Sequence, residues 1–572
     1  MQNVSQRHTE SYNRWITKND TPTASERIDM LSHAYKLQYR PRISVLMRTY
    51  NTPSALLREA IDSVCGQFYG NWELCIADDA STLPHVKDIL MGYQSRDPRI
   101  KACYRDAKGD ISAASNSALD LATGEFVAVL DHADKLSLHA LYHVAVAFNE
   151  YPGAKIVYSD EDKLDESGKR FDPHFKPDWN PDLLYSQNYI SHLGVYDAAL
   201  VREIGGFRID YEGGQDYDLL LRCVARCQDD EIIHVPKVLY HRRCQDNAAA
   251  QDTDEKRHTA DVAIRALRDY FISRGEEVTV HQGIGANTYR VQHAIPEPAP
   301  LVSLLIPTRD KLDLINTCVG SILKKTTYPN YEILILDNQS AEARTLEWFD
   351  DIQSDSRIRV LRYDHPFNYS AINNFGAKHA RGEFLGLVNN DIEVISEEWL
   401  SEMVSHAVRP KIGCVGAKLY YDDNTIQHAG VILGVGGVAS HSHKRFPREA
   451  PGYFQRLLLI QNLSAVTAAC LLVKKSIYEE VSGLNENDLT VAYNDVDFCL
   501  RVHEAGYRNL WTPYAELYHH ESISRGAEDT PEKKARFTEE QEYMKRTWGK
   551  ALDLDSAYNC NLTLSRVDFS LR

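Results

Sequence analysis

Two short polar turns of this sequence could bind a divalent cation. They read Asp131-His132-Ala133-Asp134 and Asn389-Asn390-Asp391-Ile392, and each follows a Gly-Glu-Phe triplet and an apolar run. Mg²⁺ and Mn²⁺ prefer oxygen ligands and are often held by one or two carboxylates together with substrate phosphates. Counting from the triplets aligns the turns, so that the first has Ala133 where the second has Asp391. A solvated turn without a metal is the alternative for either segment.

Two Asp-x-Asp pairs could supply a general base. Asp216-Tyr217-Asp218 and Asp495-Val496-Asp497 are each followed by a Leu/Arg-rich stretch with helical spacing. A carboxylate at such a place could take a proton from an attacking hydroxyl group. It could also cap the helix and interact with the helix macrodipole, although capping explains one aspartate more easily than the same pair twice.

Further polar candidates follow other apolar runs. His241 and the pair His519-His520 come after late strands, where a histidine is either a metal ligand or a structural side chain. Asp78-Asp79 and Asp337-Asn338 end the second predicted strand of each copy and could accept hydrogen bonds from a nucleobase or a ribose. An aspartate at that place is also an ordinary turn former or helix cap.

These motifs recur in the same order in two parts of the chain, which indicates a duplicated domain. Apolar runs at 43–47 and 301–306 are typical of buried parallel strands, and segments with helical spacing follow them. Alternating strands and helices predict an α/β fold with a mostly parallel sheet, whose ligands bind beyond the carboxyl ends of the strands. The predicted units are an N-terminal helical extension, a first domain, a helix–strand connector with a Pro-rich linker, a second domain and a C-terminal helical tail, at 1–40, 41–250, 251–298, 299–528 and 529–572.

Composition excludes several classes of protein. The 572 residues carry a formal net charge of −17, which argues against binding to a nucleic-acid backbone. No window reaches the roughly 18 consecutive apolar residues of a membrane-spanning helix, and the polar N-terminus is unlike a secretory signal. The 11 cysteines are scattered singly, as expected for a reduced, cytoplasmic protein.

Taken together, the motifs resemble the inverting family 2 glycosyltransferases of the GT-A fold. More narrowly, the chain resembles tandem two-domain enzymes of bacterial O-antigen and surface-polysaccharide assembly. The resemblance runs from about Tyr12 to Gly526 and is carried by the two polar turns, the Asp-x-Asp helices and several further segments. These include Ile111-Ser112-Ala113-Ala114-Ser115-Asn116, Tyr158-Ser159-Asp160-Glu161-Asp162-Lys163, Phe367-Asn368-Tyr369-Ser370-Ala371-Ile372-Asn373-Asn374, Gln427-His428-Ala429-Gly430 and Ala465-Val466-Thr467-Ala468-Ala469-Cys470.

The resemblance implies a role for each motif residue. The implied ligands of the nucleotide sugar are Thr308, Arg309, Asp310, Asp337, Asn373 and Asn389 in the second copy, and Thr49, Tyr50, Asn51, Asp79 and Asn116 in the first. The implied ligands of a divalent cation (Mg²⁺ or Mn²⁺) are Asp391 with His519 or His520, and Asp131, Asp134 and His241. Asp495 and Asp216 would be the catalytic bases, and Asp497 and Asp218 would contact the acceptor.

The resemblance also implies a function. We expect sugars to pass with inversion from nucleotide-diphosphate donors to a lipid-linked polysaccharide, at a cytoplasmic site peripheral to the membrane and beside other assembly enzymes. A dTDP-rhamnose-like donor is the first expectation for the second copy, and a UDP-hexose or UDP-galactofuranose donor is the alternative. Two working copies would make the chain bifunctional.

Ala133 leaves three interpretations of the first copy open. Asp131 and Asp134 suffice without a third carboxylate; the copy is a non-catalytic domain for acceptor binding or scaffolding; or the chain is a variant inactivated by substitution. A carbohydrate-binding scaffold is the rival from another class, and the second copy's Asp391 speaks against it. A nucleotide-dependent dehydrogenase would need a G-x-G-x-x-G turn after the first strand, which neither copy has.

Overall fold

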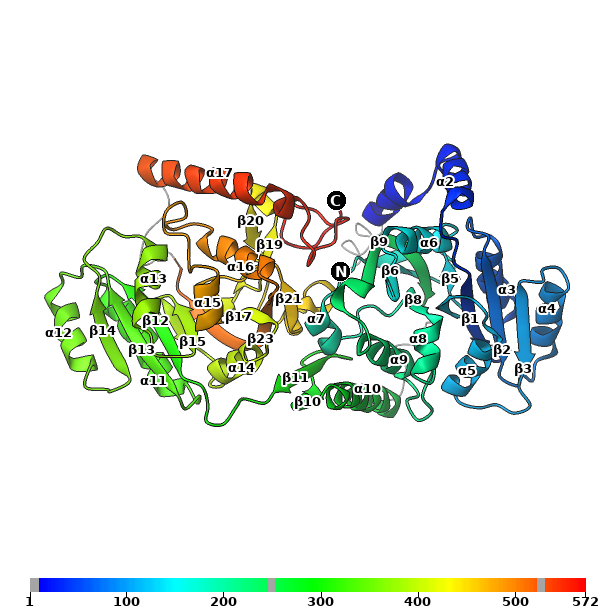
Figure 1. Ribbon diagram of the computed structural model, residues 1–572, viewed down its shortest axis with the longest axis horizontal. Helices are drawn as coiled ribbons and strands as arrows, with labels where there is room; N and C mark the ends of the chain where they lie inside the picture. Colours follow the sequence, from blue (N-terminus) through cyan, green and yellow to red (C-terminus); the bar gives the residue numbers. More distant parts are fainter. Residues whose placement is uncertain (1–9, 245–252, 522–529) are drawn as a thin grey trace.

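The computed structural model describes residues 10–244, 253–521 and 530–572, with the backbone alone at 253–256. Two α/β halves lie side by side along the long axis of the molecule (Figure 1). Each half is built around one large sheet that is covered by helices, which confirms the predicted α/β class and the duplication. We call them the first half (43–243) and the second half (302–519).

The two sheets have the same strand order. In the first half the order is β3 (Ile100–Tyr104), β2 (Trp72–Asp78), β1 (Ile43–Thr49), β4 (Phe126–Asp131), β8 (Gly194–Asp197), β6 (Ile156–Leu164), β9 (Ile232–Arg243) and β5 (Lys135–Leu136), with β7 (Arg170–His174) beside β6. In the second half it is β14 (Ile358–Arg362), β13 (Tyr331–Asp337), β12 (Val302–Thr308), β15 (Phe384–Val388), β22 (Cys470–Lys474), β17 (Ile412–Tyr420), β23 (Arg508–His519) and β16 (Ile392–Val394), with β18 (Ile426–His428) and β21 (Gln461–Leu463) attached.

The first four strands of each sheet are parallel, as predicted, whereas the other part of each sheet is mixed. β8 and β22 run antiparallel to their neighbours on both sides. β2 and β13 are buried along their whole length, because helices cover both faces of the sheet, and such strands read as continuous apolar runs. The flanking helices are α3 (Ser54–Cys65), α4 (Pro84–Gln94), α5 (Ile111–Leu121) and α6 (Ala140–Glu150), and in the second half α11 (Leu312–Lys325), α12 (Ala343–Ile352), α13 (Tyr369–His379) and α14 (Trp399–Ala407).

Strand pairing fixes the register between the halves. Ile43 pairs with Phe126 on one side and Trp72 on the other, and Val302 pairs with Phe384 and Tyr331 in the same way. The backbone turn after each fourth strand is also alike, since the N–H of Asp134 donates to Asp131 and that of Ile392 donates to Asn389. This register agrees with the predicted alignment of Ala133 with Asp391.

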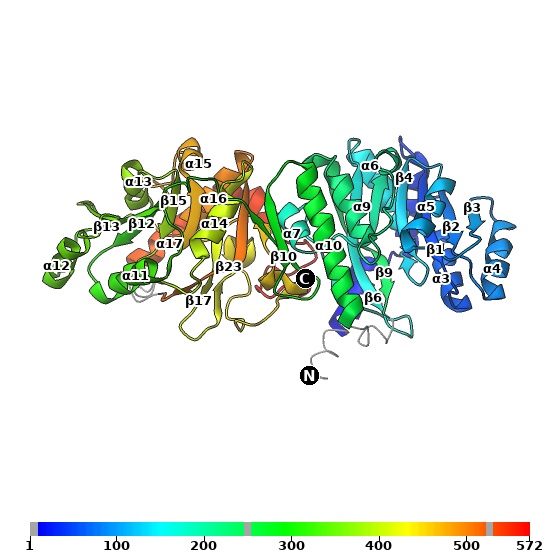
Figure 2. The same cartoon turned by 90° about the horizontal axis from the view of Figure 1, so that it is seen from below.

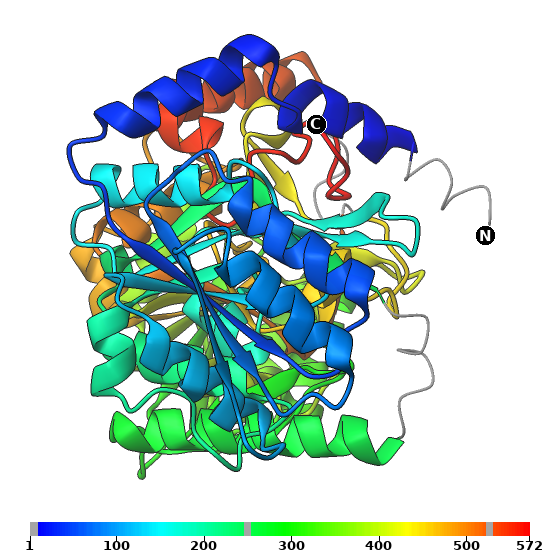
Figure 3. The ribbon, with the colours of Figure 1, turned by 90° about the vertical axis from the view of Figure 1, so that its right-hand side faces the viewer.

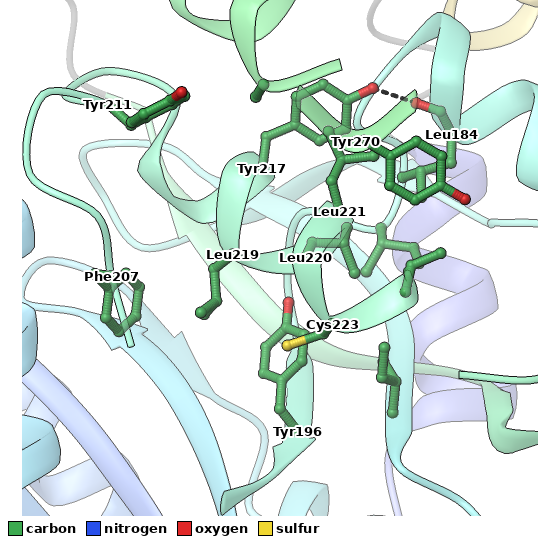
Figure 4. Packing of buried hydrophobic residues seen from close by; sticks show 14 of the residues in the cluster. Leu184, Tyr196, Phe207, Tyr211, Tyr217, Leu219, Leu220, Leu221, Cys223 and Tyr270 are labelled. Atoms are coloured by element: carbon green, nitrogen blue, oxygen red, sulfur yellow. Dashed lines mark hydrogen bonds between the residues drawn. The ribbon is translucent and has the colours of Figure 1, made fainter. Parts of the chain in front are cut away.

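The connector contributes to the first half. Its helix α10 (Thr253–Ser273) packs on α9 (Gln215–Val224), and Figure 4 shows Tyr217 and Leu221 of α9 close to Tyr270 of α10. The predicted strand after this helix is β10 (Val278–Gln282), and it pairs with β11 (Tyr289–His293), which was not predicted. Seen from below, α10 runs along one face of the molecule (Figure 2).

The N-terminal helix α2 (Ala24–Lys36) and the C-terminal helix α17 (Pro531–Asp553) lie on the same face, opposite α10 (Figure 3). The side chains of Met544, Trp548 and Leu552 pack into the core of the second half. The residues after α17 lie at the junction of the halves, where Phe569 belongs to one cluster with Phe175 of the first half and Val435 of the second. In the part of the chain that the structure describes, no helix combines the length and the apolar character needed to cross a membrane.

Candidate active site

A cavity of about 480 Å³ lies in the second half, beside the carboxyl end of β15. Its wall combines groups from the turn after β15, the start of α16 (Asn494–Glu504), the end of β23 and the helix α17. The polar and aromatic residues in this wall include Tyr369, Asn389, His441, Lys444, Tyr493, Asp495, His519, Glu521 and Phe537. The location at the carboxyl ends of parallel strands is where ligands bind in open α/β sheets.

The turn after β15 and the end of β23 bring together the candidate metal ligands. β16 pairs with β23 so that Ile392 lies opposite His519, and this pairing places the Nε2 of His519 3.3 Å from the Oδ1 of Asp391. The amide nitrogen of Asn389 lies 3.3 Å from the same Nε2, and its amide oxygen accepts from the hydroxyl of Tyr369 at 3.2 Å. A carboxylate, an imidazole and an amide therefore converge on one point.

The donor set fits a divalent cation that is shared with a substrate. The Nδ1 of His519 is buried and has no hydrogen-bond partner among the described residues. His520 is engaged elsewhere, because its ring lies between Asp422 and Glu393. Within the described ranges no three histidine, cysteine, aspartate or glutamate side chains are grouped to hold a metal alone, so a cation would need further ligands from a bound diphosphate.

Asp495 stands at the N-terminus of α16 and lines the same cavity. Its two oxygens accept from the backbone N–H of Ala468 at 3.1 Å and of Val496 at 2.9 Å. Burial raises the pKa of this carboxyl above its ordinary value. A carboxylate with a raised pKa is a stronger proton acceptor, which suits a general base.

The second aspartate of each pair has a structural role, contrary to the predicted contact with an acceptor. Asp497 is buried and accepts from Arg501, four residues later, and from the indole N–H of Trp548 at 2.9 Å. Asp218 is equally buried, between Arg222 and Arg208. Arg208 lies in the segment before α9 and Trp548 lies in α17, so these contacts join each helix to a neighbouring segment. Both aspartates are only 1% exposed, which leaves neither carboxylate accessible to a substrate.

The first turn of each half, predicted to contact the nucleotide, also organises the loop beside it. The side-chain oxygen of Asp310 accepts from the N–H groups of Ala341 and Glu342, and that of Asn51 accepts from Thr82 and Leu83. The neighbouring side chains of Arg309 and Tyr50 are exposed. Thr308 is buried and accepts from the amide of Asn390 at 3.0 Å, whereas Thr49 lies 2.7 Å from the hydroxyl of Thr52.

The nucleotide candidates Asp337 and Asp79 do not stand at equivalent places, as the aligned motifs Asp78-Asp79 and Asp337-Asn338 already indicated. Thr308 pairs with Asp337 in the second half, and Thr49 pairs with Asp78 in the first, so the counterpart of Asp337 is Asp78. Asp337 accepts from Arg362 at 2.6 Å, and Asp79 is held by Arg105 at 2.9 Å.

The nucleotide candidates Asn373 and Asn116 do not stand at equivalent places either. Asn116 exchanges hydrogen bonds with the backbone of Phe207, and Asn374 does so with Leu484, so these two clamp equivalent loops. The counterpart of Asn373 is therefore Ser115. Asn373 is buried, and its amide oxygen has no hydrogen-bond partner in the described part of the chain.

The first half arranges its predicted metal site differently. Asp131 forms a 2.8 Å contact with His132 and an ion pair with Arg48 at 3.8 Å. Burial alone would raise the pKa of Asp131, but the hydrogen bond with His132 and the charge of Arg48 lower it below its ordinary value. The same guanidinium lies 4.0 Å from Asp216, the candidate base.

Two further predicted ligands of the first half are occupied by other groups. Both oxygens of Asp134 accept hydrogen bonds, from the hydroxyl of Tyr240 at 2.6 Å and the N–H of Arg243 at 2.7 Å. His241 was predicted beside Asp131, but its Nδ1 lies 2.6 Å from Asp162, in a polar cluster with Tyr12 and Arg170. The motif alignment is one residue out of register here, because Lys135 pairs with His241 whereas Ile392, the counterpart of Asp134, pairs with His519.

Several residues of the second-half cavity were not predicted. His441 lines the cavity, and its Nδ1 lies 2.7 Å from that of His428, which is buried outside the cavity wall. Burial lowers the pKa of both rings, that of His441 to about 4, so both stay neutral near pH 7. His428 lies in a motif that carried the resemblance, which was the available signal. Phe537 comes from α17, and its ring lies 5.6 Å from that of Tyr493, so the predicted tail supplies part of the cavity wall.

Sequence comparisons match both halves. The pattern of the family described as Glycosyl transferase family 2 matches residues 44–203 and 303–482. The protein y4gI of Sinorhizobium fredii is 54% identical over 94% of this chain and 59% of its own length. The O-antigen biosynthesis protein RfbC of Myxococcus xanthus is 38% identical over 94% of this chain and 41% of its own length. The chain thus spans about half the length of these two relatives.

Similar solved structures cover less of the chain. S. aureus TarS 1–349 in complex with UDP-GlcNAc is 18% identical over 40% of this chain and 66% of its own, with a TM-score of 0.34. The mannosyltransferase PcManGT from Pyrobaculum calidifontis in complex with GDP-Man and Mn²⁺ is 16% identical over 45% of this chain and 67% of its own, with a TM-score of 0.33.

Proposed function

Since the chain belongs to glycosyl transferase family 2, we propose that its second half transfers a sugar from a nucleotide-diphosphate donor to a polysaccharide acceptor, with inversion. The observation that carries this proposal is that His519 and Asp495 line one cavity and that Asp391 lies 3.3 Å from His519. RfbC, named as an O-antigen biosynthesis protein, supports a bacterial surface polysaccharide as the product. The lipid-linked acceptor, peripheral membrane location and neighbouring assembly enzymes belong to the same proposal.

Each of these residues has its own role in the proposed reaction. Asp391 and His519 would hold a Mg²⁺ or Mn²⁺ ion, which when bound supplies positive charge to the departing diphosphate. Asp495 takes the proton of the acceptor hydroxyl group. At the same time the oxygen of that hydroxyl group forms the new bond to the anomeric carbon. The bond from that carbon to the diphosphate breaks on the opposite face, so the configuration is inverted.

The cavity wall offers contacts for the sugars. Tyr493 and Phe537 present aromatic rings at one side, and Lys444 and Glu521 add opposite charges at another. Aromatic faces with a few polar groups are typical of sites that orient a polar ligand. We propose a dTDP-rhamnose-like donor first and a UDP-hexose donor as the alternative.

A second candidate function concerns the first half. Arg48 lies beside both Asp131 and Asp216 there, and Ala133 replaces a carboxylate, which favours a half that binds donor or acceptor without transferring sugar. Transfer by both halves is the competing possibility.

Thermal unfolding of the full chain with Mn²⁺ and single nucleotides tests the donor. We expect one nucleoside diphosphate to raise Tm by several degrees, because a ligand that binds only the folded state stabilises it. Mass spectrometry of the product from one lipid-linked acceptor and each donor, singly and in pairs, then identifies the sugar added. Equal stabilisation by every nucleotide, with no donor used, would contradict the proposal.

A further inference from the structure

Arg48 occupies a distinctive place in the first half. It lies near the end of β1, directly opposite Asp131 of β4 in the parallel ladder. Its side chain is only 17% exposed, and its guanidinium lies between Asp131, at 3.8 Å, and Asp216, at 4.0 Å. A fixed positive charge therefore stands between the candidate metal ligand and the candidate base.

The second half has no such charge at the equivalent place. Arg48 pairs with Ala77, and Pro307 pairs with Leu336 in the matching ladder, so the counterpart of Arg48 is Pro307. Proline has no backbone N–H to donate, and the β12–β15 ladder ends at the Leu305–Leu387 pair. Asp131, which lies opposite Arg48, corresponds to Asn389 in the second half, and the amide nitrogen of Asn389 lies 3.3 Å from His519.

The first half also lacks a donor set for a metal. Ala133 supplies no oxygen from its side chain, both oxygens of Asp134 already accept hydrogen bonds, and His241 is held by Asp162. The neighbours of Asp131 are the imidazole of His132, at 2.8 Å, and the guanidinium of Arg48, at 3.8 Å. The fixed positive charge of this guanidinium would repel a cation. The residues present do not fit a divalent metal.

Arg48 keeps donor capacity for an anion. The only hydrogen bond of its guanidinium among the described residues goes to the hydroxyl of Ser115, at 3.4 Å. Its distances to the two carboxylates exceed the roughly 2.7–3.2 Å of a hydrogen bond. A guanidinium has five N–H donors in a planar fork that matches phosphate oxygens.

We infer that the first half binds the diphosphate of a nucleotide without a divalent cation, with Arg48 as the fixed positive charge. The chain then takes one catalytic metal, in the second half, although it has two homologous sites. This inference rests on the proposed function, because it assumes that both halves recognise nucleotide diphosphates. It assigns Arg48 a binding role that no motif in the sequence indicated.

Counting bound Mn²⁺ tests the first part. Free Mn²⁺ is measured by electron paramagnetic resonance in equilibrium dialysis of the full chain with dTDP or UDP. We expect one Mn²⁺ per chain, lost in Asp391→Asn and kept in Asp131→Asn. Two ions per chain, or loss of the ion in Asp131→Asn, would overturn this inference and leave the proposed function of the second half intact. No bound ion would contradict the metal role of Asp391 in the proposed function, and with it the contrast between the halves.

Nucleotide binding in EDTA tests the second part. Isothermal titration of the Asp391→Asn chain with dTDP and with UDP should show metal-free binding. Arg48→Gln should weaken it at least about tenfold, the scale of one charge-assisted hydrogen bond lost. The control is Arg42→Gln, which removes a half-exposed guanidinium from near the other end of β1, where it pairs with Glu73, and should change affinity less than about twofold.

Arg48→Lys keeps the positive charge, and it replaces Arg48→Gln in the binding measurement if the glutamine variant does not fold. It should retain part of the affinity, because an ammonium binds phosphate as a point charge without the fork. Absence of binding in EDTA, or equal affinity in the parent, Arg48→Gln and Arg48→Lys chains, would overturn the assignment of Arg48.

Discussion

The Nε2 of His519 lies 3.3 Å from the Oδ1 of Asp391, although one residue ends β23 and the other belongs to the turn after β15. The short strand β16 makes this contact, because it starts directly after Asp391 and pairs antiparallel with the end of β23. The contact between His519 and Asp391 therefore depends on the fold of the whole second half. Several predictions concern the residues around this contact.

Asp495→Asn should lower kcat by about 10²–10⁴-fold, the usual contribution of a general base, while donor affinity is kept. The base works only when it is deprotonated, and burial raises its pKa. The rate should therefore fall with decreasing pH at values above the ordinary Asp pKa of about 3.9. A pH profile of kcat/KM shows this acidic limb. Activity within threefold of the parent in Asp495→Asn would show that another group is the base.

Glu540→Ala should loosen the loop that leads into Asp495. The carboxylate of Glu540, in α17, accepts from the hydroxyl of Thr490 and from the N–H groups of Val491 and Ala492. Losing these acceptors should cost about 1–3 kcal/mol of unfolding free energy and raise the KM for acceptor.

The matched control for this variant is Glu542→Ala in the same helix, where the side chain is 60% exposed and pairs with Lys545. Its unfolding free energy should change by less than about 0.5 kcal/mol. Urea denaturation and initial rates measure both variants. An equal effect of the two substitutions would remove the special role of Glu540.

Asp182→Asn should destabilise the junction between the halves. Asp182 of α7 (Pro181–Ser186) forms a buried ion pair with Arg409 at 2.5 Å. Removing one partner of a buried pair leaves the other charge uncompensated, which typically costs about 3–5 kcal/mol. Urea denaturation should show this loss, and Asp182→Asn/Arg409→Gln should recover part of it. A loss below about 1 kcal/mol would mean that solvent reaches the pair.

The same pair predicts a pH dependence of stability. Burial alone would raise the pKa of Asp182, but Arg409 and Arg508 lower it to about 2. The unfolded chain has a pKa of about 3.9 for Asp, so the stabilisation is complete above that value and is lost as pH falls toward 2. The parent chain should lose more stability over this range than Asp182→Asn.

The sheet cores could be predicted because buried parallel strands read as uninterrupted apolar runs. The strands predicted at 43–47 and 301–306 correspond to β1 and β12, and their predicted bounds differ from the observed ones by at most two residues at each end. The strand β11 was not predicted, because its strand conformation depends on the pairing with β10. The packing of α17 against the second half is a tertiary property, so Phe537 and Glu540 gave no signal in the sequence.

The motifs allowed the site residues of the second half to be predicted. They were less reliable for deciding which residues of the two halves correspond. The turn with Asp391 and the helix with Asp495 do meet in one cavity, as the motifs indicated. Asp79 and Asn116 of the first half do not stand at the places of Asp337 and Asn373, because residue type alone does not fix which positions of the two halves correspond. Arg48 was not predicted, because its contacts with Asp131 and with Asp216 of α9 depend on the tertiary fold.

The central claim is that sugar transfer takes place in the second half and needs Asp391. Transfer of a radiolabelled sugar from the nucleotide donor in the presence of Mn²⁺ is measured for Asp391→Asn and for Asp131→Asn, the residue held by Arg48 in the first half. We predict that Asp391→Asn loses at least about 100-fold in kcat, as for loss of several kcal/mol of transition-state stabilisation, while Asp131→Asn stays within threefold of the parent. Loss of transfer in Asp131→Asn with activity kept in Asp391→Asn would contradict the account.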